Sequence, residues 1–208
     1  MSEDRFNAEA ATWDFHQDRV ERARIIAEQI FQLVPITKEM QVMDFGSGTG
    51  LLGFHFVEKA KTVTFADTSK GMLEQVESKA QKGNMKNVGT INLTEQSLPG
   101  HYDVIVSLLT LHHIEDTQDC IRTLANQLLP GGTLCICDLD KEDGSFHGEK
   151  KVPHNGFVRS DIESTFKNSQ LGEFKVCTGM IEKKVIDGAF VEYPIFIAIG
   201  RKAGSTSN

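Results

Sequence analysis

One stretch of this chain constrains its fold more than any other: residues 42–50, with the sequence VMDFGSGTG. A short apolar run ends near an acidic residue, and three glycines then follow at every second position. Glycine occurs where the backbone turns sharply or approaches a ligand closely, because it has no Cβ. When such a turn follows a strand and opens a helix, its backbone N–H groups face a ligand. The Asp44 carboxylate beside the turn disfavours a phosphate and suits a ligand that carries positive charge.

Length and charge set broad limits on the function of the chain. Its 208 residues favour one domain, residues 1–208, large enough to bury a proper core. The hydrophobic fraction of 39% and the charged fraction of 25% are ordinary for a soluble globular protein. The net charge is −7 and no dense run of Lys and Arg occurs, which argues against a nucleic-acid partner.

The start of the chain and its cysteines indicate a reduced, cytoplasmic protein. The first five residues, MSEDR, contain no apolar signal core, and no apolar run approaches the ~20 residues of a membrane span. The cysteines form no CxxC pair and have no zinc-ligand spacing. Cys135 and Cys137 stand two apart in an apolar run, so we expect both to lie buried on one face of a strand. We expect no membrane insertion, and the oligomeric state stays open.

Hydrophobic periodicity predicts a helical segment followed by alternating strands and helices. In residues 1–40, apolar residues recur at spacings of three and four until Pro35 ends the pattern. Strands are then expected at residues 41–45, 62–66, 88–93, 103–109 and 133–138, and helices at residues 51–59, 69–82, 119–129 and 160–169. Nearly continuous apolar strands separated by helices indicate a parallel sheet covered on both faces.

The C-terminal part departs from this alternation. Residues 174–184 and 193–201 are expected to form two strands of an antiparallel hairpin, with Asp187-Gly188 as a turn signal between them. Before this hairpin, Ser160 and Glu163, three residues apart, match a capping box at the start of the helix expected at residues 160–169. Residues 203–208 are expected to form a frayed tail.

The glycine turn contains two overlapping cofactor patterns. Gly48, Gly50 and Gly53 make a literal GxGxxG, and Asp67 follows roughly 20 residues later, as a dinucleotide fold requires. However, the first glycine after the expected strand is Gly46, and a dinucleotide site needs its glycines immediately after the strand. Asp67 closes the second expected strand, where a carboxylate accepts hydrogen bonds from both hydroxyls of a ribose. The alternative for Asp67 is a cap of the helix that begins near residue 69.

Four segments in the same order carry a resemblance to a known family. They are DFGSGTG at residues 44–50, DTSKGML at residues 67–73, YDVIVSLLTLHHI at residues 102–114, and LPGGT at residues 129–133. In this order and spacing, the chain resembles the class I S-adenosylmethionine-dependent methyltransferases over residues 6–202. It is most similar to the small-molecule branch that includes the quinone C-methyltransferases. Phe6, Ala10, Trp13 and Asp14 match the segment that precedes the core in that branch.

The resemblance implies a fold and a cofactor. The fold is an α/β Rossmann-like sheet of seven strands in the order 3-2-1-4-5-7-6, mostly parallel with strand seven antiparallel, and with helices on both faces. The cofactor is S-adenosyl-L-methionine, and the product is S-adenosyl-L-homocysteine. The implied cofactor-binding residues are Asp44 near the methionine amine, Gly46, Gly48 and Gly50 at the methionine end, Asp67 and Thr68 at the ribose, Met72 at the adenine, and the Ser107 backbone at the amine.

One position departs from the family pattern. The family usually carries an acid in the loop after strand three, near the adenine amino group. Counting back from Leu98-Pro99, this position falls on Thr94, and Glu95 is one residue away. We therefore expect either a shift of the loop or a neutral group in this role.

Histidines supply the candidates for acceptor chemistry. In the family that the chain resembles, the run with His112 and His113 closes strand four, and His154 belongs to a segment that resembles the His-x-Gly-Phe start of the last helix. Adjacent histidines in an extended segment point apart, so we expect no metal site. Asp138, Asp140 and His147 are expected on the same rim. The alternative is that these histidines only shape or pack the pocket.

The sequence thus predicts methyl transfer from S-adenosylmethionine to a small-molecule acceptor by in-line displacement, under an N-terminal lid with Trp13 and Phe15. Two alternatives stay open at this point: a nicotinamide-dependent oxidoreductase and a non-catalytic S-adenosylmethionine-binding subunit. The first requires a Tyr-x-x-x-Lys pair or a second domain, and neither Tyr102 nor Tyr193 is followed by Lys at that spacing. The acceptor atom, O, N, S or C, is not identified by the sequence.

Overall fold

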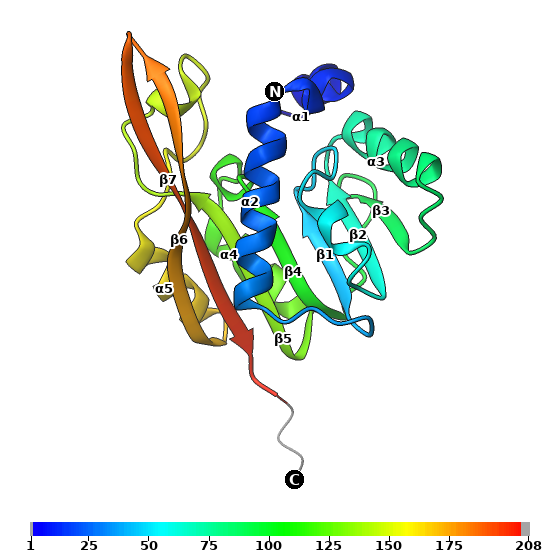
Figure 1. The fold of residues 1–208 in the computed structure, drawn as a ribbon. Coiled ribbons are helices and arrows are strands. Elements are labelled where there is room, and N and C mark those ends of the chain that lie inside the picture. The colour runs from blue at the N-terminus through cyan, green and yellow to red at the C-terminus, as the bar shows by residue number, and fades with distance from the viewer. Residues whose placement is uncertain (1, 205–208) are drawn as a thin grey trace.

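A seven-stranded sheet forms the centre of the protein (Figure 1). The computed structural model describes residues 2–204, and the strands run in the order β3-β2-β1-β4-β5-β7-β6, as predicted. β7 pairs antiparallel with both β5 and β6, while β1 to β5 pair in parallel. The strand bounds are β1 (Gln41–Phe45), β2 (Thr62–Asp67), β3 (Val88–Asn92), β4 (Tyr102–Leu108), β5 (Leu128–Leu139), β6 (Leu171–Ile186) and β7 (Ala189–Lys202).

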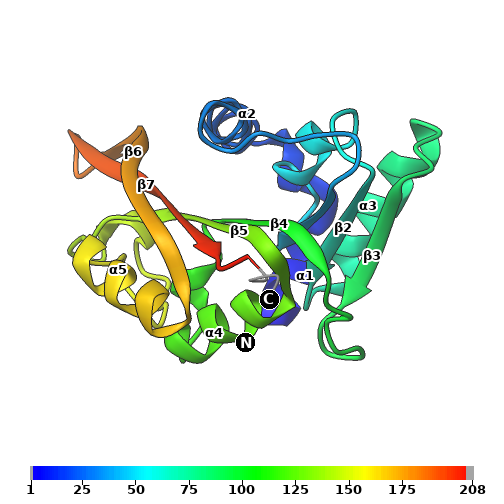
Figure 2. The same cartoon turned by 90° about the horizontal axis from the view of Figure 1, so that it is seen from below.

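Helices cover both faces of this sheet. The longer helices are α1 (Ser2–Glu9), α2 (Gln17–Leu33), α3 (Lys70–Lys82), α4 (Thr117–Gln127) and α5 (Arg159–Asn168), and the short 3-10 helices are η1 (Ala10–Phe15), η2 (Gly53–Phe56), η3 (Leu111–His113) and η4 (Ser145–His147). Figure 2 shows α2 on one side of the sheet and α4 and α5 on the other. Among residues 2–204, no helix combines the length and the apolar character needed to cross a membrane.

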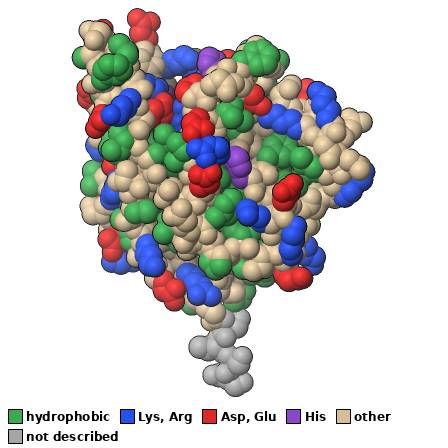
Figure 3. Space-filling view, in the orientation of Figure 1, with side chains coloured by type: hydrophobic (Ala, Val, Ile, Leu, Met, Phe, Trp, Pro, Cys, Tyr) green, Lys and Arg blue, Asp and Glu red, His purple; other side chains and the backbone are tan. Residues whose placement is uncertain are grey.

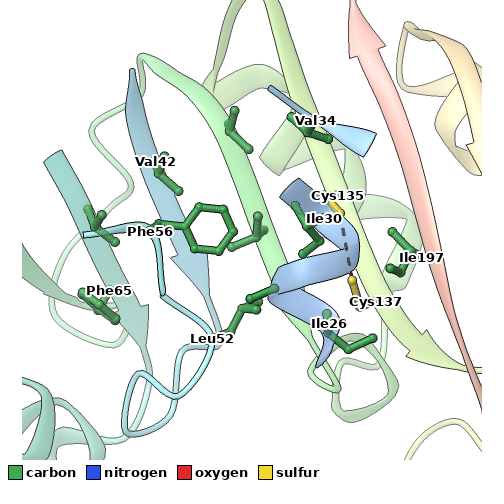
Figure 4. Packing of buried hydrophobic residues seen from close by; sticks show 14 of the residues in the cluster. Ile26, Ile30, Val34, Val42, Leu52, Phe56, Phe65, Cys135, Cys137 and Ile197 are labelled. Carbon is green, nitrogen blue, oxygen red and sulfur yellow. Dashed lines mark hydrogen bonds between the residues drawn. The ribbon is translucent and has the colours of Figure 1, made fainter. Parts of the chain in front are cut away.

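The alternation of side chains along each strand produces two hydrophobic cores. Val42 belongs to the core under α2, next to Phe56, and Ile26 and Ile30 of α2 join the same core near the buried Cys135 and Cys137 (Figure 4). Met43, one residue along, belongs to the core under α4 and α5. This is the arrangement expected for strands buried on both faces, because successive side chains point in opposite directions.

The helix predicted at residues 51–59 is wrong, because only η2 and irregular turns occupy this segment. The Gly53 N–H donates to the Asp44 carboxylate at 2.9 Å, and the carbonyl of Thr49 accepts from the Lys79 ammonium at 2.8 Å. These contacts hold the segment against β1 and α3, and it continues as tight turns and the short 3-10 helix η2. Over so few residues, the spacing of apolar side chains does not distinguish such turns from a regular α-helix.

The capping box predicted at Ser160 and Glu163 is also wrong. Helix α5 begins one residue earlier, with Val158 at its N-cap and no side-chain cap bond. At the first residue of the helix, Nε and Nη2 of Arg159 each donate a hydrogen bond of 2.7 Å to the Asp140 carboxylate. Glu163 instead pairs with Lys167 at 2.6 Å.

The remaining elements lie where the sequence predicts, but three strands are longer than expected: β5 begins at Leu128 instead of residue 133, β6 begins at Leu171 instead of residue 174, and β7 begins at Ala189 instead of residue 193. Asp187 and Gly188 both adopt positive φ angles, of 49° and 81°, so the hairpin between β6 and β7 turns where the sequence predicts. Helix α4 ends at Gln127, two residues earlier than expected, because Leu128 already pairs with β4. The tail expected at residues 203–208 lies outside the described residues from position 205 onward.

A buried ion pair fastens α2 to the end of the sheet. Arg22 donates to both carboxylate oxygens of Glu182, on β6, at 2.6 and 2.8 Å. The side chains are only 12% and 9% exposed. Removing one partner of such a pair leaves the other charge buried without compensation, which is more costly than removing both.

We expect Arg22→Ala to lower the free energy of unfolding by about 3 kcal/mol, measured by urea denaturation, because Glu182 keeps its buried charge. The Arg22→Ala, Glu182→Ala double variant should lose less stability than the sum of the two single variants. Arg24→Ala, which breaks exposed pairs on the same helix, is the matched control. A loss below about 1 kcal/mol in Arg22→Ala, typical of an exposed pair, would contradict the assignment.

Candidate functional site

The glycine turn after β1 is shaped by close contacts that exclude larger residues. Gly46, Gly48 and Gly50 all have positive φ angles, of 66°, 52° and 87°. A Cβ on Gly46 would lie 2.1 Å from the side chain of Thr110, which follows β4. Gly46 follows directly after β1, so the turn has the register that the methyltransferase pattern requires. The turn presents its backbone to a cavity, as a ligand-binding glycine turn should.

Asp44 lies under this turn as a buried carboxylate. Its Oδ2 accepts the hydrogen bond from the Gly53 N–H, and within residues 2–204 no hydrogen bond reaches its Oδ1. The pKa of Asp44 is raised to about 7, mainly by burial and to a smaller extent by the nearby Asp67 carboxylate, although the Gly53 N–H opposes the shift. A buried acid of this kind gains from a cation placed next to it.

Asp67 holds the other side of the turn. Its Oδ2 accepts from the Gly48 N–H at 2.7 Å and its Oδ1 accepts from the Ser69 N–H at 2.8 Å. The cap of helix α3 is Ser69, whose hydroxyl accepts from the Met72 N–H at 3.2 Å, so Asp67 is not the N-cap. Each carboxylate oxygen has further lone pairs for a ligand. Burial raises the pKa of Asp67.

A cavity of about 280 Å³ opens beside the turn. Its wall combines the two acids with apolar and aromatic side chains from β4, α3 and the N-terminal segment. The lining residues are Phe6, Trp13, Arg19, Arg22, Ala23, Asp44, Phe45, Gly46, Ser47, Gly48, Leu51, Leu52, Asp67, Thr68, Met72, Leu93, Leu108, Leu109, Thr110, His113 and Ile114. The cavity lies at the carboxyl ends of β1, β2 and β4, where parallel α/β sheets bind ligands.

The N-terminal segment forms one wall of this cavity. Asp14 accepts from the Thr49 hydroxyl at 2.5 Å and also pairs with Lys79, so the segment is fastened to the glycine turn. The rings of Phe6 and Trp13 meet edge to face at 5.7 Å and both line the cavity. The expectation that Phe15 joins Trp13 over the cavity is wrong, because the Phe15 side chain is 76% exposed and does not line the cavity.

The predicted cofactor residues fall into two groups. Asp44, Gly46, Gly48, Asp67, Thr68 and Met72 line the cavity together. Gly50 and Ser107 are buried but are not part of the lining. Thr94 and Glu95 are exposed and also lie outside it, because the Asn92 side chain turns the chain there by accepting from Thr94. In this segment the residue that reaches the cavity is Leu93.

The histidines form a packed cluster at the ends of β4 and β5. The Nδ1 of His112 lies 2.6 Å from the fully buried Asp138 carboxylate, and its Nε2 is buried without a partner among the described residues. The centre of the His112 ring lies 4.1 Å from the centre of the His113 ring and 4.8 Å from the centre of the His147 ring. Of these three, only His113 lines the cavity.

The environment of the cluster keeps two of its rings neutral. Burial, with His112 and His147 close by, lowers the pKa of His113 to about 3. Burial also lowers the pKa of His147, to about 4. Within the part of the chain that the structure describes, no three His, Cys, Asp or Glu side chains are arranged to hold a metal ion.

His154 lies apart from the cavity. The ring Nε2 of His154 lies 3.0 Å from the Ile114 carbonyl and 3.1 Å from the Glu115 carbonyl. The backbone N–H of His154 donates to the His112 carbonyl. The side chain thus links the loop before α5 to the segment after β4. These contacts place His154 in the support of the site, and any catalytic role for it stays a prediction.

The sequence reading did not identify Arg19 and Thr110 as site residues. Arg19 stacks on the Trp13 ring, with its guanidinium carbon 3.6 Å from the ring centre, and it lines the cavity. A basic residue six positions after the only Trp was a signal for this contact, but a charged residue at the start of an amphipathic helix normally faces solvent. Thr110 gave no signal, because its contact with Gly46 depends on the pairing of β1 with β4.

The residues present fit an S-adenosylmethionine-type ligand. Two carboxylates face a cavity that would receive a sulfonium and an ammonium, and both glycines at the wall leave space for a close approach. Met72 and Leu93 supply an apolar surface near Asp67, as an adenine next to a ribose needs. A dinucleotide fits less well, because its pyrophosphate would lie against the buried Asp44.

Comparison with known proteins agrees with this geometry. A family model described as a methyltransferase domain matches residues 36–188. An uncharacterized methyltransferase of Schizosaccharomyces pombe is 29% identical over 156 residues, which cover 66% of this chain and 55% of that protein. The ubiquinone/menaquinone biosynthesis C-methyltransferase UbiE of Shewanella sediminis is 33% identical over 109 residues, or 49% of this chain and 43% of UbiE. The chain therefore spans about half the length of the curated relatives it matches.

Solved structures share the fold. A Haloferax volcanii methyltransferase, solved in a complex with a methyltransferase activator, has a TM-score of 0.80 at 14% identity and covers 99% of both chains. The YcgJ protein of Bacillus subtilis has a TM-score of 0.70 at 18% identity over 86% of this chain and 99% of its own. With the family match over residues 36–188, these findings show that the chain belongs to the methyltransferase domain family, among the class I S-adenosylmethionine-dependent methyltransferases.

Proposed function

We propose that this protein transfers a methyl group from S-adenosylmethionine to a small-molecule acceptor. The observation that carries the proposal is the cavity at the carboxyl ends of β1, β2 and β4, which joins two carboxylates to an apolar, aromatic wall. Phe6 and Trp13 add an apolar, aromatic wall to this concave site, which suits a small acceptor better than a folded macromolecule.

The relatives support the same class of acceptor. One is named a ubiquinone/menaquinone biosynthesis C-methyltransferase, and a Rickettsia typhi relative, 27% identical over 122 residues, is named a ubiquinone biosynthesis O-methyltransferase. Methylation at carbon and at oxygen thus both occur among the relatives, and the fold alone does not fix the reaction. One structural neighbour, with a TM-score of 0.66, is named a [4+2]-cyclase. A turnover measurement is therefore essential.

The distribution of charge disfavours a nucleic-acid substrate. On the face drawn in Figure 3, Lys and Arg side chains are interspersed with Asp and Glu side chains. A nucleic-acid site gathers basic residues into a continuous patch, and the net charge of −7 opposes it further. Small-molecule transfer fits this surface better.

The chemistry asks little of the protein beyond positioning. The bound donor supplies an electrophilic methyl group that is activated by its positive sulfur. In our proposal the glycine turn, Asp44 and Asp67 hold that donor, with Thr68 and Met72 along the nucleoside. Phe6 and Trp13 exclude water, and the wall formed by Leu109 and Thr110 directs the acceptor toward the methyl group.

His113 is the polar group that we propose orients the acceptor. It lines the cavity, and the Phe6 ring covers it at 5.4 Å edge to face. A neutral imidazole both donates and accepts a hydrogen bond, so it holds a hydroxyl or a carbonyl without adding charge. Behind it, Asp138 fixes the His112 ring, against which His113 packs.

The proposal is tested first by calorimetric titration with S-adenosylmethionine, S-adenosylhomocysteine and NAD. Both sulfur cofactors should bind and NAD should not, because Asp44 repels a pyrophosphate. Asp67→Asn should lower the affinity for S-adenosylhomocysteine by about 10-fold, because charge-assisted hydrogen bonds to the ribose are lost. Glu95→Gln, outside the cavity, is the matched control. Binding of NAD alone would support an oxidoreductase instead.

A homocysteine-release assay over phenols, quinols, amines, thiols and carbon acids then tests methyl transfer. We expect turnover with at least one small-molecule class. Cofactor binding without turnover on any small molecule would favour a non-catalytic subunit.

The affinity for S-adenosylhomocysteine should rise with pH through the pKa of Asp44, near 7. The ligand's ammonium favours ionised Asp44, so at low pH binding must first remove a proton. Between pH 6 and pH 8 the association constant should increase about 10-fold, measured by titration calorimetry. The Asp44→Asn variant should bind more weakly and lose this pH dependence. An equal pH dependence in the variant and the wild type would contradict the role of Asp44.

His113 should affect acid stability. Its folded-state pKa of about 3 lies below the ordinary value near 6.5, so the unfolded chain takes up its proton first as the pH falls. Stability associated with neutral His113 is therefore present above pH 6.5 and is lost progressively toward pH 3. His113→Asn should lose less unfolding free energy than the wild type between pH 7 and pH 4, measured by urea denaturation. Identical pH dependence would show that His113 is not held neutral.

A further inference from the structure

The hairpin of β6 and β7 projects past the rest of the sheet. The pairing of β5 with β7 ends where Leu139 meets Ile195, whereas β6 and β7 stay paired as far as Ile186 and Ala189. At about 3.3 Å per residue, the hairpin extends about 20 Å beyond β5 (Figure 1). β6 runs in the same direction as β1 to β5, because β7 is antiparallel to both β5 and β6. The hairpin therefore projects from the end of the sheet at which the cavity lies.

One face of this projecting hairpin packs against the protein, and the other lies open. On the packed face, Glu182 forms the buried ion pair with α2, and the Lys184 ammonium donates to a backbone carbonyl of η4 at 2.9 Å. The open face carries Ile181 and Val185 from the alternate positions of β6, and Phe190 of β7, which pairs with Val185. Their exposed fractions rise toward the tip, from 47% to 62% and 80%.

A further exposed aromatic ring, Phe15 at the end of η1, lies at the same end of the molecule. Along α2, Gln17 precedes Arg22 by five residues, or about 8 Å. Along β6, Val185 follows Glu182 by three residues, or about 10 Å. The ion pair joins Arg22 to Glu182, and Figure 1 shows that α2 and β6 run in opposite directions. The start of α2 and the tip of the hairpin therefore extend to the same side of this ion pair.

The size of the exposed apolar area indicates which kind of surface fits. Phe15 and Phe190 each leave roughly 150 Å² of side chain in water, and Ile181 and Val185 together add roughly 100 Å². The sum of roughly 400 Å², divided between two elements, is about half of what each partner buries in a stable protein complex. A lipid surface needs no continuous complementary patch, because binding depends on the apolar area that enters it.

The charges beside these side chains indicate which lipid surface fits. On the open face, Lys183 lies 2.9 Å from Glu192, and Glu9, directly before η1, lies 3.7 Å from Lys150. Such pairs leave little field to attract a charged surface. Asp187 in the turn of the hairpin, together with the net charge of −7, disfavours an anionic one. A zwitterionic lipid surface meets neither objection.

We propose that this end of the molecule docks on a zwitterionic lipid surface, with the tip of the β6–β7 hairpin and Phe15 entering its apolar region. The cavity lies at the same end, at the carboxyl ends of β1, β2 and β4, so docking brings it toward the lipid. Contact of this kind uses exposed side chains and needs no membrane-spanning helix. The inference goes beyond the proposed function and does not depend on it, because docking requires neither donor nor acceptor.

Sedimentation with phosphatidylcholine vesicles tests the proposal. The wild-type protein should sediment with the vesicles. Phe190→Ser and Phe15→Ser should each lower the partition coefficient about 10-fold, because each removes one large apolar side chain from the lipid. Both side chains are exposed, so these changes should leave the fold intact, which circular dichroism checks. Leu33→Ser, at the opposite end of α2, is the matched control and should leave partitioning unchanged.

A single tryptophan then reports the orientation of the docked protein. In a Trp13→Phe background, Phe190→Trp places the only Trp of the chain at the hairpin tip. Brominated phosphatidylcholine should quench its fluorescence. Leu33→Trp in the same background is the control and should not be quenched.

Three results would overturn the proposal. The first is a wild-type protein that stays in the supernatant, or that binds only when anionic lipid is added. The second is equal sedimentation of the wild type, Phe190→Ser and Phe15→Ser, because binding would then use another surface. The third is self-association without vesicles that Phe190→Ser abolishes, measured by sedimentation velocity, since it would assign the open face to a second copy of this chain.

Discussion

The site depends on two carboxylates that hold one glycine turn. Asp44, at the end of β1, accepts from Gly53, and Asp67, at the end of β2, accepts from Gly48. These bonds fix both sides of the turn. Burying each acid is unfavourable, so burial raises the pKa of both, and Asp67 adds a smaller contribution to the raised pKa of Asp44. A cationic ligand relieves that cost, so the same interaction that shapes the turn also selects what binds there.

The rest of the molecule supports this arrangement from three sides. The pairing of β1 with β4 brings Thr110 against Gly46, where no side chain would fit. The N-terminal segment is fastened to the turn by Asp14 and adds Phe6 and Trp13 to the wall. On the far side, Asp138 and the histidine cluster form a buried polar support behind His113. Donor binding and acceptor binding therefore share one cavity but use different elements of the fold.

Local patterns predicted the positions of most strands and helices, but not how the strands are ordered in the sheet. The order of strands followed from the family resemblance, and the turn at Asp187 and Gly188 followed from its residue types. The helix expected at residues 51–59 failed because tight turns and the short 3-10 helix η2 occupy this segment. Over so few residues, apolar spacing does not separate a 3-10 turn from an α-helix. The cap at Ser160 failed because the helix already begins at Arg159, whose side chain binds the Asp140 carboxylate.

The sequence predicted those residues of the candidate site that lie at or directly after the end of a strand. Asp44, Gly46, Gly48 and Asp67 follow directly from the motif and meet at one cavity. Thr110 and Arg19 reach the cavity only through tertiary packing, and their sequence positions do not reveal it. Thr94 and Glu95 were placed by counting along a loop, and the turn at Asn92 directs Leu93 to the cavity instead.

The most direct test of this account is a crystal structure of the protein with S-adenosylhomocysteine. We predict that the amino-acid end lies between the glycine turn and Asp44, with both ribose hydroxyls within hydrogen-bond distance of the Asp67 carboxylate and the adenine against Met72 and Leu93. A nucleoside bound outside this cavity, or one turned so that its ribose lies away from Asp67, would contradict the account.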